Sequence, residues 1–141
     1  PLFLGGIEFE GETGLEGHSD ADALLHSAVD ALLGAGGLGD IGQHFPNSEP
    51  KWKNEPSSSF LHYAAKLLKE GGWLIQNLDL TVVAERPKVM THAESIRCNI
   101  AAILEIDPSR VNVKATTNEG MGFIGRGEGI AALATATISK L

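Results

Sequence analysis

The stretch HSDADALLHSAVDALLGAGG, residues 18–37, contains the clearest helix signal of the chain. Ser19 is a suitable N-cap, and Asp22 three residues later completes a capping box. The apolar residues that then follow with helical spacing are Leu24, Leu25, Ala28, Val29, Leu32 and Leu33. Glycines from residue 34 onward end the pattern. The stretch therefore predicts an amphipathic helix that begins just after Ser19.

Three polar residues of this stretch, His18, Asp22 and His26, recur every four positions. On a helix this spacing places them on one face, about one turn apart. Two imidazoles and a carboxylate in line suit a metal site, either as ligands or as a ligand with a supporting neighbour. The alternative is that Asp22 only caps the helix and that both histidines are surface residues or hydrogen-bonded core residues.

The remainder of the chain predicts short strands and two more helices. Strands are expected at residues 2–4, 7–9, 78–85, 111–115 and 130–139, and helices at residues 57–70, with a cap within 57–59, and 91–104. Because the chain contains no repeat or linker, residues 1–141 are expected to form a single α+β domain. The last strand is mostly Ala, Thr and Ile. It either packs against another surface, such as a second subunit, or is a central strand under helices.

The composition excludes several classes of function. The chain has 141 residues, of which 43% are hydrophobic and 21% charged, as is typical of a globular protein. A net charge of -7 argues against nucleic-acid binding but leaves room for a phosphorylated substrate at a local group of cations. Cys98 is the only cysteine, so an internal disulfide is excluded and a reducing compartment is expected. No apolar run approaches the roughly 20 residues that span a bilayer, so no membrane partner is expected.

Two further segments carry candidate functional residues. Asp40 lies in LGDIG, where it either bonds its own backbone in a turn or meets a ligand hydroxyl. In KATTNEG, residues 114–120, two threonine hydroxyls and the carboxylate of Glu119 suit a phosphate bridged by Mg²⁺ or Mn²⁺, unless they only face water.

A glycine-rich loop follows, GMGFIGRGEG at residues 120–129. Arg126 among exposed backbone N–H groups predicts an anion site, and the alternative is an ordinary hairpin loop. The helix ladder and these polar segments together suggest a metal-assisted reaction on a phosphate or diphosphate.

Three long motifs resemble those of one enzyme family. They are HSDADALLHSAVDALLGAGGLGDIGQHFP from residue 18, AERPK from residue 84 and VNVKATTNEGMGFIGRGEGIAA from residue 111. These motifs, in their residues and in their order along the chain, resemble those of the 2-C-methyl-D-erythritol 2,4-cyclodiphosphate synthases of the non-mevalonate isoprenoid pathway. The resemblance covers nearly the whole chain. It implies a four-stranded mixed sheet backed by helices, in a homotrimer whose sheets face a threefold axis and whose active sites lie between subunits.

The resemblance also implies a reaction. Enzymes of this family convert 4-diphosphocytidyl-2-C-methyl-D-erythritol 2-phosphate to the 2,4-cyclodiphosphate and release CMP. The substrate's own 2-phosphate attacks the β-phosphorus, so no protein nucleophile is needed and catalysis rests on positioning and charge neutralisation. The implied cofactors are Zn²⁺ together with Mg²⁺ or Mn²⁺. The implied compartment is the bacterial cytoplasm or the plastid stroma.

Individual residues match the family's site by position. His26 matches a zinc ligand with Asp22 as its supporting neighbour, and Glu119 matches the ligand of Mg²⁺ or Mn²⁺. The residues matched to catalysis are His18, Ser19, Thr117 and Glu119. Those matched to substrate binding are His18, Ser19, Asp40, Gly42, Phe45, Ala84, Pro87, Lys88, Met90, Thr116, Thr117, Phe123 and Arg126.

The chain departs from the family pattern at two places. The family takes its other two zinc ligands from an Asp-x-His motif that would lie upstream of Pro1 and that the printed sequence does not contain. In FPNSEP, Asn47 stands where the family usually has an aspartate, so no acidic role is expected there. A second hypothesis is therefore a non-catalytic trimeric module that binds cytidine nucleotides or isoprenoid diphosphates.

Overall fold

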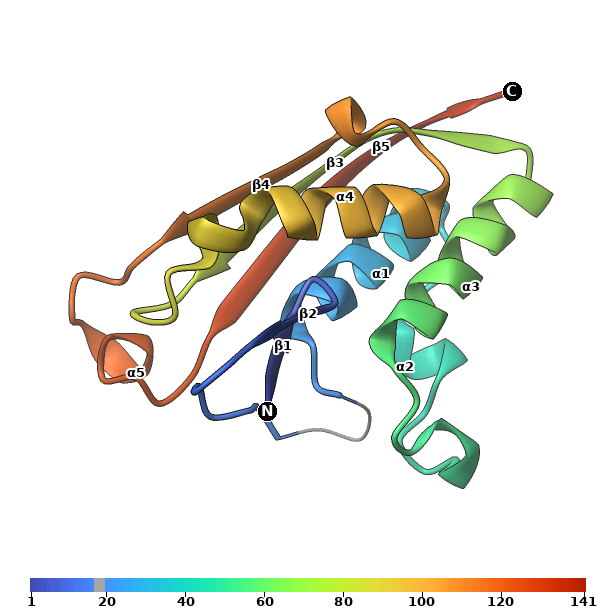
Figure 1. The fold of residues 1–141 in the computed structure, drawn as a ribbon. Helices are drawn as coiled ribbons and strands as arrows, with labels where there is room; N and C mark the ends of the chain where they lie inside the picture. Colours follow the sequence, from blue (N-terminus) through green and yellow to red (C-terminus); the bar gives the residue numbers. More distant parts are fainter. Residues whose placement is uncertain (17–19) are drawn as a thin grey trace.

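A three-stranded mixed sheet forms the centre of the structure (Figure 1). Its strands are β3 (Trp73–Val83), β4 (Val111–Thr116) and β5 (Ala131–Lys140), in the order β4-β3-β5. Strand β4 is parallel to β3, and β5 is antiparallel to it. The computed structural model describes residues 1–16 and 20–141.

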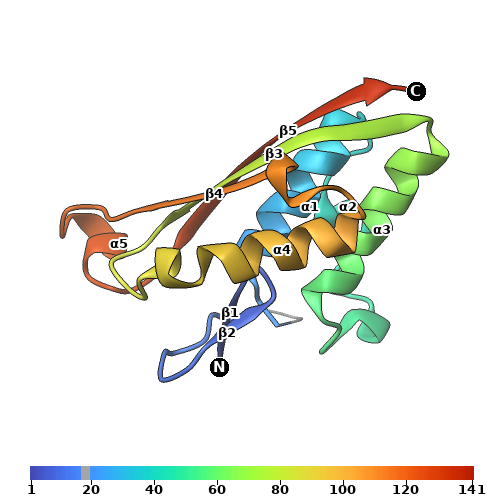
Figure 2. The ribbon, with the colours of Figure 1, turned by 45° about the horizontal axis from the view of Figure 1, so that its top comes forward.

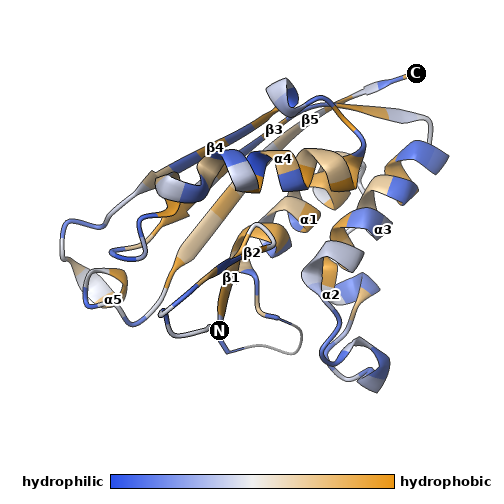
Figure 3. Cartoon of the chain, in the orientation of Figure 1, coloured by the Kyte–Doolittle hydropathy of each residue, from blue (hydrophilic) through white to orange (hydrophobic). Residues whose placement is uncertain are grey.

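Three helices cover one face of this sheet, as Figure 2 shows from a second direction. They are α1 (Ala23–Ala35), α3 (Ser57–Glu70) and α4 (Ala93–Leu104). Their apolar stripes and the inward residues of β3 and β4 form one core. In Figure 3 the buried helix α1 is largely apolar, whereas the segment between α2 and α3 is mostly polar. In the described part of the chain nothing covers the opposite face of the sheet, where the side chain of Leu133 is 58% exposed.

The predicted four-stranded sheet is wrong. Strands β1 (Leu2–Leu4) and β2 (Ile7–Phe9) pair with each other in a separate two-stranded sheet. Their connecting turn, Gly5-Gly6, is bonded to the start of α1 rather than to a third strand. The expected strands themselves are present, and the α+β class and the mixed sheet are confirmed.

The predicted start of α1 is also wrong. Asp22 is the N-cap, with extended backbone angles, and its carboxylate accepts the backbone N–H of Leu25 at 2.9 Å. Of Asp22 and His26, only His26 therefore lies within the helix. His18 and Ser19, the predicted cap, lie outside the described residues.

Helix α3 is also capped differently from the prediction. Pro56 is at the N-cap position without a side-chain bond, and Ser57 is the first residue of the helix. The N–H of Ser57 donates to Asp20 Oδ2 at 2.9 Å, so a carboxylate from the segment before α1 satisfies the start of α3.

Five short helical segments were missed. They are α2 (Ile41–His44), η1 (Pro50–Trp52), η2 (Val89–His92), η3 (Pro108–Arg110) and α5 (Gly122–Gly125). Segments of three or four residues are too short to give a periodic apolar pattern.

Strand β5 lies at an edge of the sheet, because within the described residues it pairs only with β3. The prediction of a central strand is therefore wrong, although helix α1 does pack against it. The small residues allow this close approach. No helix in the described residues is long and apolar enough to span a membrane.

Candidate active site

His26 is held in the first turn of α1 by a hydrogen bond to another helix. Its Nε2 atom lies 2.8 Å from Ser57 Oγ at the start of α3. Burial lowers the pKa of His26, and the carboxylates of Asp22, Asp20 and Asp30 partly oppose this shift. A neutral imidazole at physiological pH is the form that a metal ion can bind.

A cavity of about 500 Å³ opens beside His26, between α1, α2 and α3. Gly42 and Phe45 line it together with His26, so three residues assigned from the first motif lie around one space. Phe45 is 6% exposed and packs on Phe60 with ring centroids 4.3 Å apart. Trp52 meets the edge of the Phe45 ring at 5.0 Å, which gives the cavity a rigid apolar wall.

Asp40 is the N-cap of α2 and directly precedes Ile41 and Gly42, which line the cavity. Its carboxylate accepts the backbone N–H of Gln43 at 2.9 Å, so the turn interpretation describes its local role. The side chain is exposed, and its remaining acceptor positions face outward.

Asp22 is fully buried and bonds to backbone rather than to His26. Its carboxylate accepts the N–H groups of Gly5 at 2.9 Å, Gly6 at 2.7 Å and Leu25 at 2.9 Å. Burial raises the pKa of Asp22, and these three bonds act against that rise. Asp22 therefore acts on His26 through its charge and through the position of the helix, not through a direct hydrogen bond.

The second group of predicted residues lies where β4 ends. Thr116 is the last residue of β4, and its carbonyl accepts the N–H of Ala84 at 3.0 Å. Thr117 Oγ1 accepts the N–H of Glu119 at 3.2 Å, and Glu119 has a left-handed backbone with φ 52°. This turn leaves the Glu119 side chain exposed at the surface.

Glu85 holds this turn and was not predicted. Its carboxylate accepts the N–H of Asn118 at 2.7 Å and that of Gly120 at 3.2 Å. Two backbone bonds from one carboxylate fix the loop that carries Glu119. The sequence offered no signal for this role, because Glu85 follows a strand and its partners lie 33 and 35 residues away.

The segment from Ala84 to Met90 lies beside this turn and forms part of an open hollow. Pro87 and Lys88 line it with residues 8–12 of the hairpin and the segment that follows it. Met90 is 53% exposed, so its side chain is available for contact.

Arg126 forms a bidentate ion pair with Glu128. Its Nε and Nη2 atoms donate to the two carboxylate oxygens at 3.0 and 3.1 Å, and both side chains are more than half exposed. In this structure the arginine of the predicted anion site is thus paired with a carboxylate of the same loop. Phe123 is 55% exposed and lies close to Gly129.

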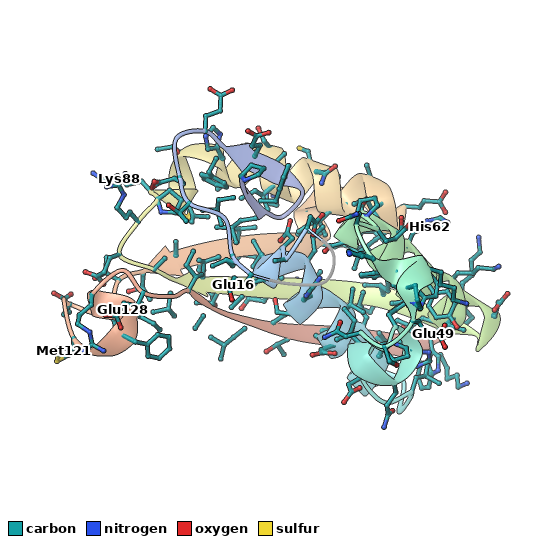
Figure 4. All side chains as sticks on the ribbon, turned by 90° about the horizontal axis from the view of Figure 1, so that it is seen from below. Glu16, Glu49, His62, Lys88, Met121 and Glu128 are labelled. Carbon is teal, nitrogen blue, oxygen red and sulfur yellow. The ribbon has the colours of Figure 1, made fainter. Side chains whose placement is uncertain are left out.

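The two groups of predicted residues lie apart in one chain. None of residues 84–90 or 116–128 lines the cavity at His26. Figure 4 shows Lys88, Met121 and Glu128 at one end of the molecule and Glu49 at the opposite end, with Glu16, which lines the cavity, between them.

Comparison with known proteins identifies the family. The model of the YgbB family matches residues 1–139. The chain belongs to the YgbB family. A 2-C-methyl-D-erythritol 2,4-cyclodiphosphate synthase from Symbiobacterium thermophilum is 55% identical over 139 residues, which are 99% of this chain and 88% of that protein. The resemblance recognised in the sequence motifs is thereby confirmed.

Other relatives are longer or have been solved with a ligand. A bifunctional enzyme IspD/IspF from Erythrobacter litoralis is 54% identical over 99% of this chain, and the chain spans only 36% of it. The solved structure titled IspF (Plasmodium falciparum) CDP complex superposes with a TM-score of 0.88 at 36% identity, covering 99% of this chain and 83% of that one. YgbB-family proteins thus occur both alone and as part of larger enzymes.

The metal site expected for a YgbB-family chain is only partly present in the described residues. Residues 1–16 and 20–141 contain no group of three or more His, Cys, Asp or Glu side chains placed to hold a metal ion. His26 fits one position of a zinc site, since it is an imidazole at a cavity wall. Glu119 is an exposed carboxylate, and Mg²⁺ and Mn²⁺ prefer such oxygen ligands.

Besides Glu85, two more site residues escaped sequence reasoning. Ser57 was considered only as a helix cap, and Asp20 was not singled out. Both are connected to His26 by hydrogen bonds that span 31 and 37 residues of sequence, so no local spacing could have indicated them. The complete burial of Ser57 does indicate a role for its side chain, but this burial can be seen only in the three-dimensional structure and not in the sequence.

Proposed function

We propose that this chain cyclises 4-diphosphocytidyl-2-C-methyl-D-erythritol 2-phosphate to 2-C-methyl-D-erythritol 2,4-cyclodiphosphate and releases CMP. The names of YgbB-family relatives at 55% and 52% identity support this activity. The CDP complex of a structural relative supports a cytidine diphosphate site. As a reaction within one substrate molecule, it fits a chain whose candidate site has polar and metal-binding groups but no assigned nucleophile.

The chemistry balances without a covalent enzyme intermediate. An oxygen of the 2-phosphate forms a bond to the β-phosphorus, and the bond from that phosphorus to the oxygen of CMP breaks. CMP leaves with that oxygen and the bonding electrons. The protein must bring two anionic phosphates together, which is strongly repulsive in an unshielded site. Positioning and charge neutralisation are therefore the two tasks of the site.

We assign the two groups of residues to the two ends of the substrate. Around the cavity, His26 would hold Zn²⁺, and the residues that would bind the erythritol phosphate end are His18, Ser19, Asp40, Gly42 and Phe45. At the end of β4, Glu119 would hold Mg²⁺ or Mn²⁺. The residues that would bind the cytidine diphosphate end are Ala84, Pro87, Lys88, Met90, Thr116, Thr117, Phe123 and Arg126. The bound ions would supply positive charge to the phosphate oxygens.

The observation that carries this proposal is the separation of these two groups within one chain. Neither group alone can hold both ends of one substrate, whereas two chains side by side can. We therefore infer a closed homotrimer in which His26 of one subunit and Glu119 of a neighbour face the same substrate. The open face of the sheet and the exposed small residues of β5 support such packing.

The test is CMP release by the purified full-length protein. With the cytidyl substrate, Zn²⁺ and Mg²⁺, we expect CMP and a cyclic diphosphate in equal amounts, measured by chromatography and phosphorus NMR. Glu119→Gln should lower turnover by at least tenfold, because an amide is a weaker ligand of a hard cation. Glu105→Gln is the matched control, since Glu105 is also exposed and left-handed with φ 57° but lies at the end of α4.

The competing hypothesis is a binding module. It predicts that the protein binds cytidine diphosphate but releases no CMP above a metal-free control. That outcome would overturn the enzyme proposal and retain the ligand class.

A further inference from the structure

A continuous series of hydrogen bonds links three polar side chains: Asp20 before α1, Ser57 at the start of α3, and His26. The hydroxyl of Ser57 donates to Asp20 Oδ1, and His26 Nε2 lies 2.8 Å from the same hydroxyl. The backbone N–H of Ser57 donates to Asp20 Oδ2 at 2.9 Å. Asp20 thus accepts two hydrogen bonds from one residue.

The positions of the protons in this series of hydrogen bonds determine the tautomer of His26. A carboxylate can only accept, so the single hydroxyl proton of Ser57 is used on Asp20. Ser57 Oγ must then accept from the imidazole, which means that His26 carries its proton on Nε2. In a neutral imidazole the lone pair is then on Nδ1.

Burial and one further hydrogen bond fix the side chains of Asp20 and Ser57 in this geometry. Ser57 is fully buried, so water does not compete for its hydroxyl. Asp20 Oδ1 also accepts the N–H of Asp22 at 3.1 Å, which fixes the carboxylate to the backbone that enters α1. The imidazole is therefore oriented by both helices at once.

We propose that Asp20 and Ser57 form a positioning pair that holds His26 as the Nε2–H tautomer and presents Nδ1 as the metal-binding atom. This inference rests on the proposed zinc role of His26 and adds two residues to it. A ligand imidazole fixed through its second nitrogen is more basic and better oriented than an unsupported one. Neither residue lines the cavity beside His26, so we assign both an effect that acts through His26.

The tautomer is tested directly by NMR. In metal-free full-length protein labelled with ¹⁵N-histidine, two-bond proton–nitrogen correlations should show the His26 ring with its proton on Nε2 and should show a slowly exchanging Hε2. After zinc is added, the large nitrogen shift should fall on Nδ1. A proton on Nδ1, or zinc bound through Nε2, would overturn the proposal whatever the variants do.

Variants test the effect on zinc. Ser57→Ala removes the hydroxyl but keeps the backbone bond to Asp20, and we expect it to weaken zinc binding by roughly 10- to 100-fold in a chelator competition. Ser57→Thr should restore the affinity. Ser58→Ala, one position along the same helix and not fully buried, is the matched control and should leave it unchanged. Equal zinc affinities of Ser57→Ala and Ser58→Ala would contradict the positioning role.

These measurements separate this inference from the proposed function. If the protein releases no CMP while the tautomer and the zinc affinities are as expected, the reaction is wrong and the positioning pair stands. If CMP release is normal and Ser57→Ala binds zinc like the wild type, the reaction stands and the pair is wrong.

Discussion

The carboxylate of Asp22 accepts the backbone N–H of Gly6 at 2.7 Å, which connects the turn of the β1–β2 hairpin to the first turn of α1. The same carboxylate accepts the N–H groups of Gly5 and Leu25. One fully buried side chain therefore joins the small sheet to the helix that carries His26. The position of the candidate metal ligand depends on this junction.

Replacing Asp22 should destabilise the fold. In Asp22→Asn one acceptor oxygen becomes an N–H₂ donor inside a fully buried site, so at least one of the three backbone N–H groups loses its acceptor. We expect the free energy of unfolding, measured with urea, to fall by about 2 to 4 kcal/mol. Glu8→Gln makes the same chemical change at an exposed position of the same hairpin and should alter it by less than about 0.5 kcal/mol. Equal effects of the two changes would show that the junction does not stabilise the fold.

Gly6 is required by both backbone angle and space. Its φ is +81°, and a Cβ there would collide with the side-chain amide of Asn99, which itself bonds the carbonyl of Gly5 at 2.9 Å. Gly11 has a similar φ of +78° but open space around it. Gly11→Ala should therefore lower stability by about 1 kcal/mol from backbone strain alone, and Gly6→Ala by about 2 kcal/mol or more. The difference between the thermal midpoints of the two variants measures the cost of the collision at Gly6. Equal midpoints would show that the collision has no cost.

Phe45 is expected to serve both stability and the cavity. It is 6% exposed and contacts Phe60, Trp52 and Tyr63. Phe45→Ala should lower the free energy of unfolding by about 3 kcal/mol. Phe123→Ala, at a ring that is 55% exposed, should lower it by less than about 1 kcal/mol. Urea titrations of both variants that give similar losses would contradict the packing described for the cavity wall.

Asp79 on β3 makes stability dependent on pH. Hydrogen bonds from Lys114, at 2.8 Å, and Asn112 lower the pKa of Asp79 below its usual 3.8. A carboxylate with a lowered folded pKa contributes stability above the unfolded pKa and loses it as the pH falls through the folded value. Lys114→Met should therefore reduce stability by less than about 1 kcal/mol near neutral pH, because the pair is largely exposed.

The same variant has a distinct signature in acid. As the pH falls below about 4, the difference in unfolding free energy between Lys114→Met and the wild type should shrink, because Asp79 becomes protonated in both. NMR titration of the Asp79 carboxyl should show a higher pKa in the variant. An unchanged pKa would mean that the ion pair is not formed in solution.

The longer elements could be predicted from sequence because their signals are local. The apolar spacing from Leu24 to Leu33 identified α1, and the alternation around Leu80 identified β3, although β3 begins at Trp73, earlier than expected. The number of strands in the sheet was not predictable, because Gly5-Gly6 bonds to Asp22 rather than to another strand.

The candidate site was predictable only in part, for the same reason. Residues within one motif, such as Thr117 and Glu119, could be associated by spacing. The partners of His26 could not, because Ser57 and Asp20 approach it from a different helix and from a different turn. The roles of individual residues came from the family resemblance rather than from periodicity.

The central claim is that one reaction site needs His26 from one subunit and Glu119 from another. The most direct test uses two inactive variants, His26→Ala and Glu119→Gln, which are co-expressed with different affinity tags and purified through both. If sites form between neighbours in a closed trimer, each doubly tagged trimer contains one site in three with both intact residues, so the mixture should regain CMP release at about a third of the wild-type rate. Mixed oligomers that contain both variants and yet release no more CMP than either variant alone would contradict the account.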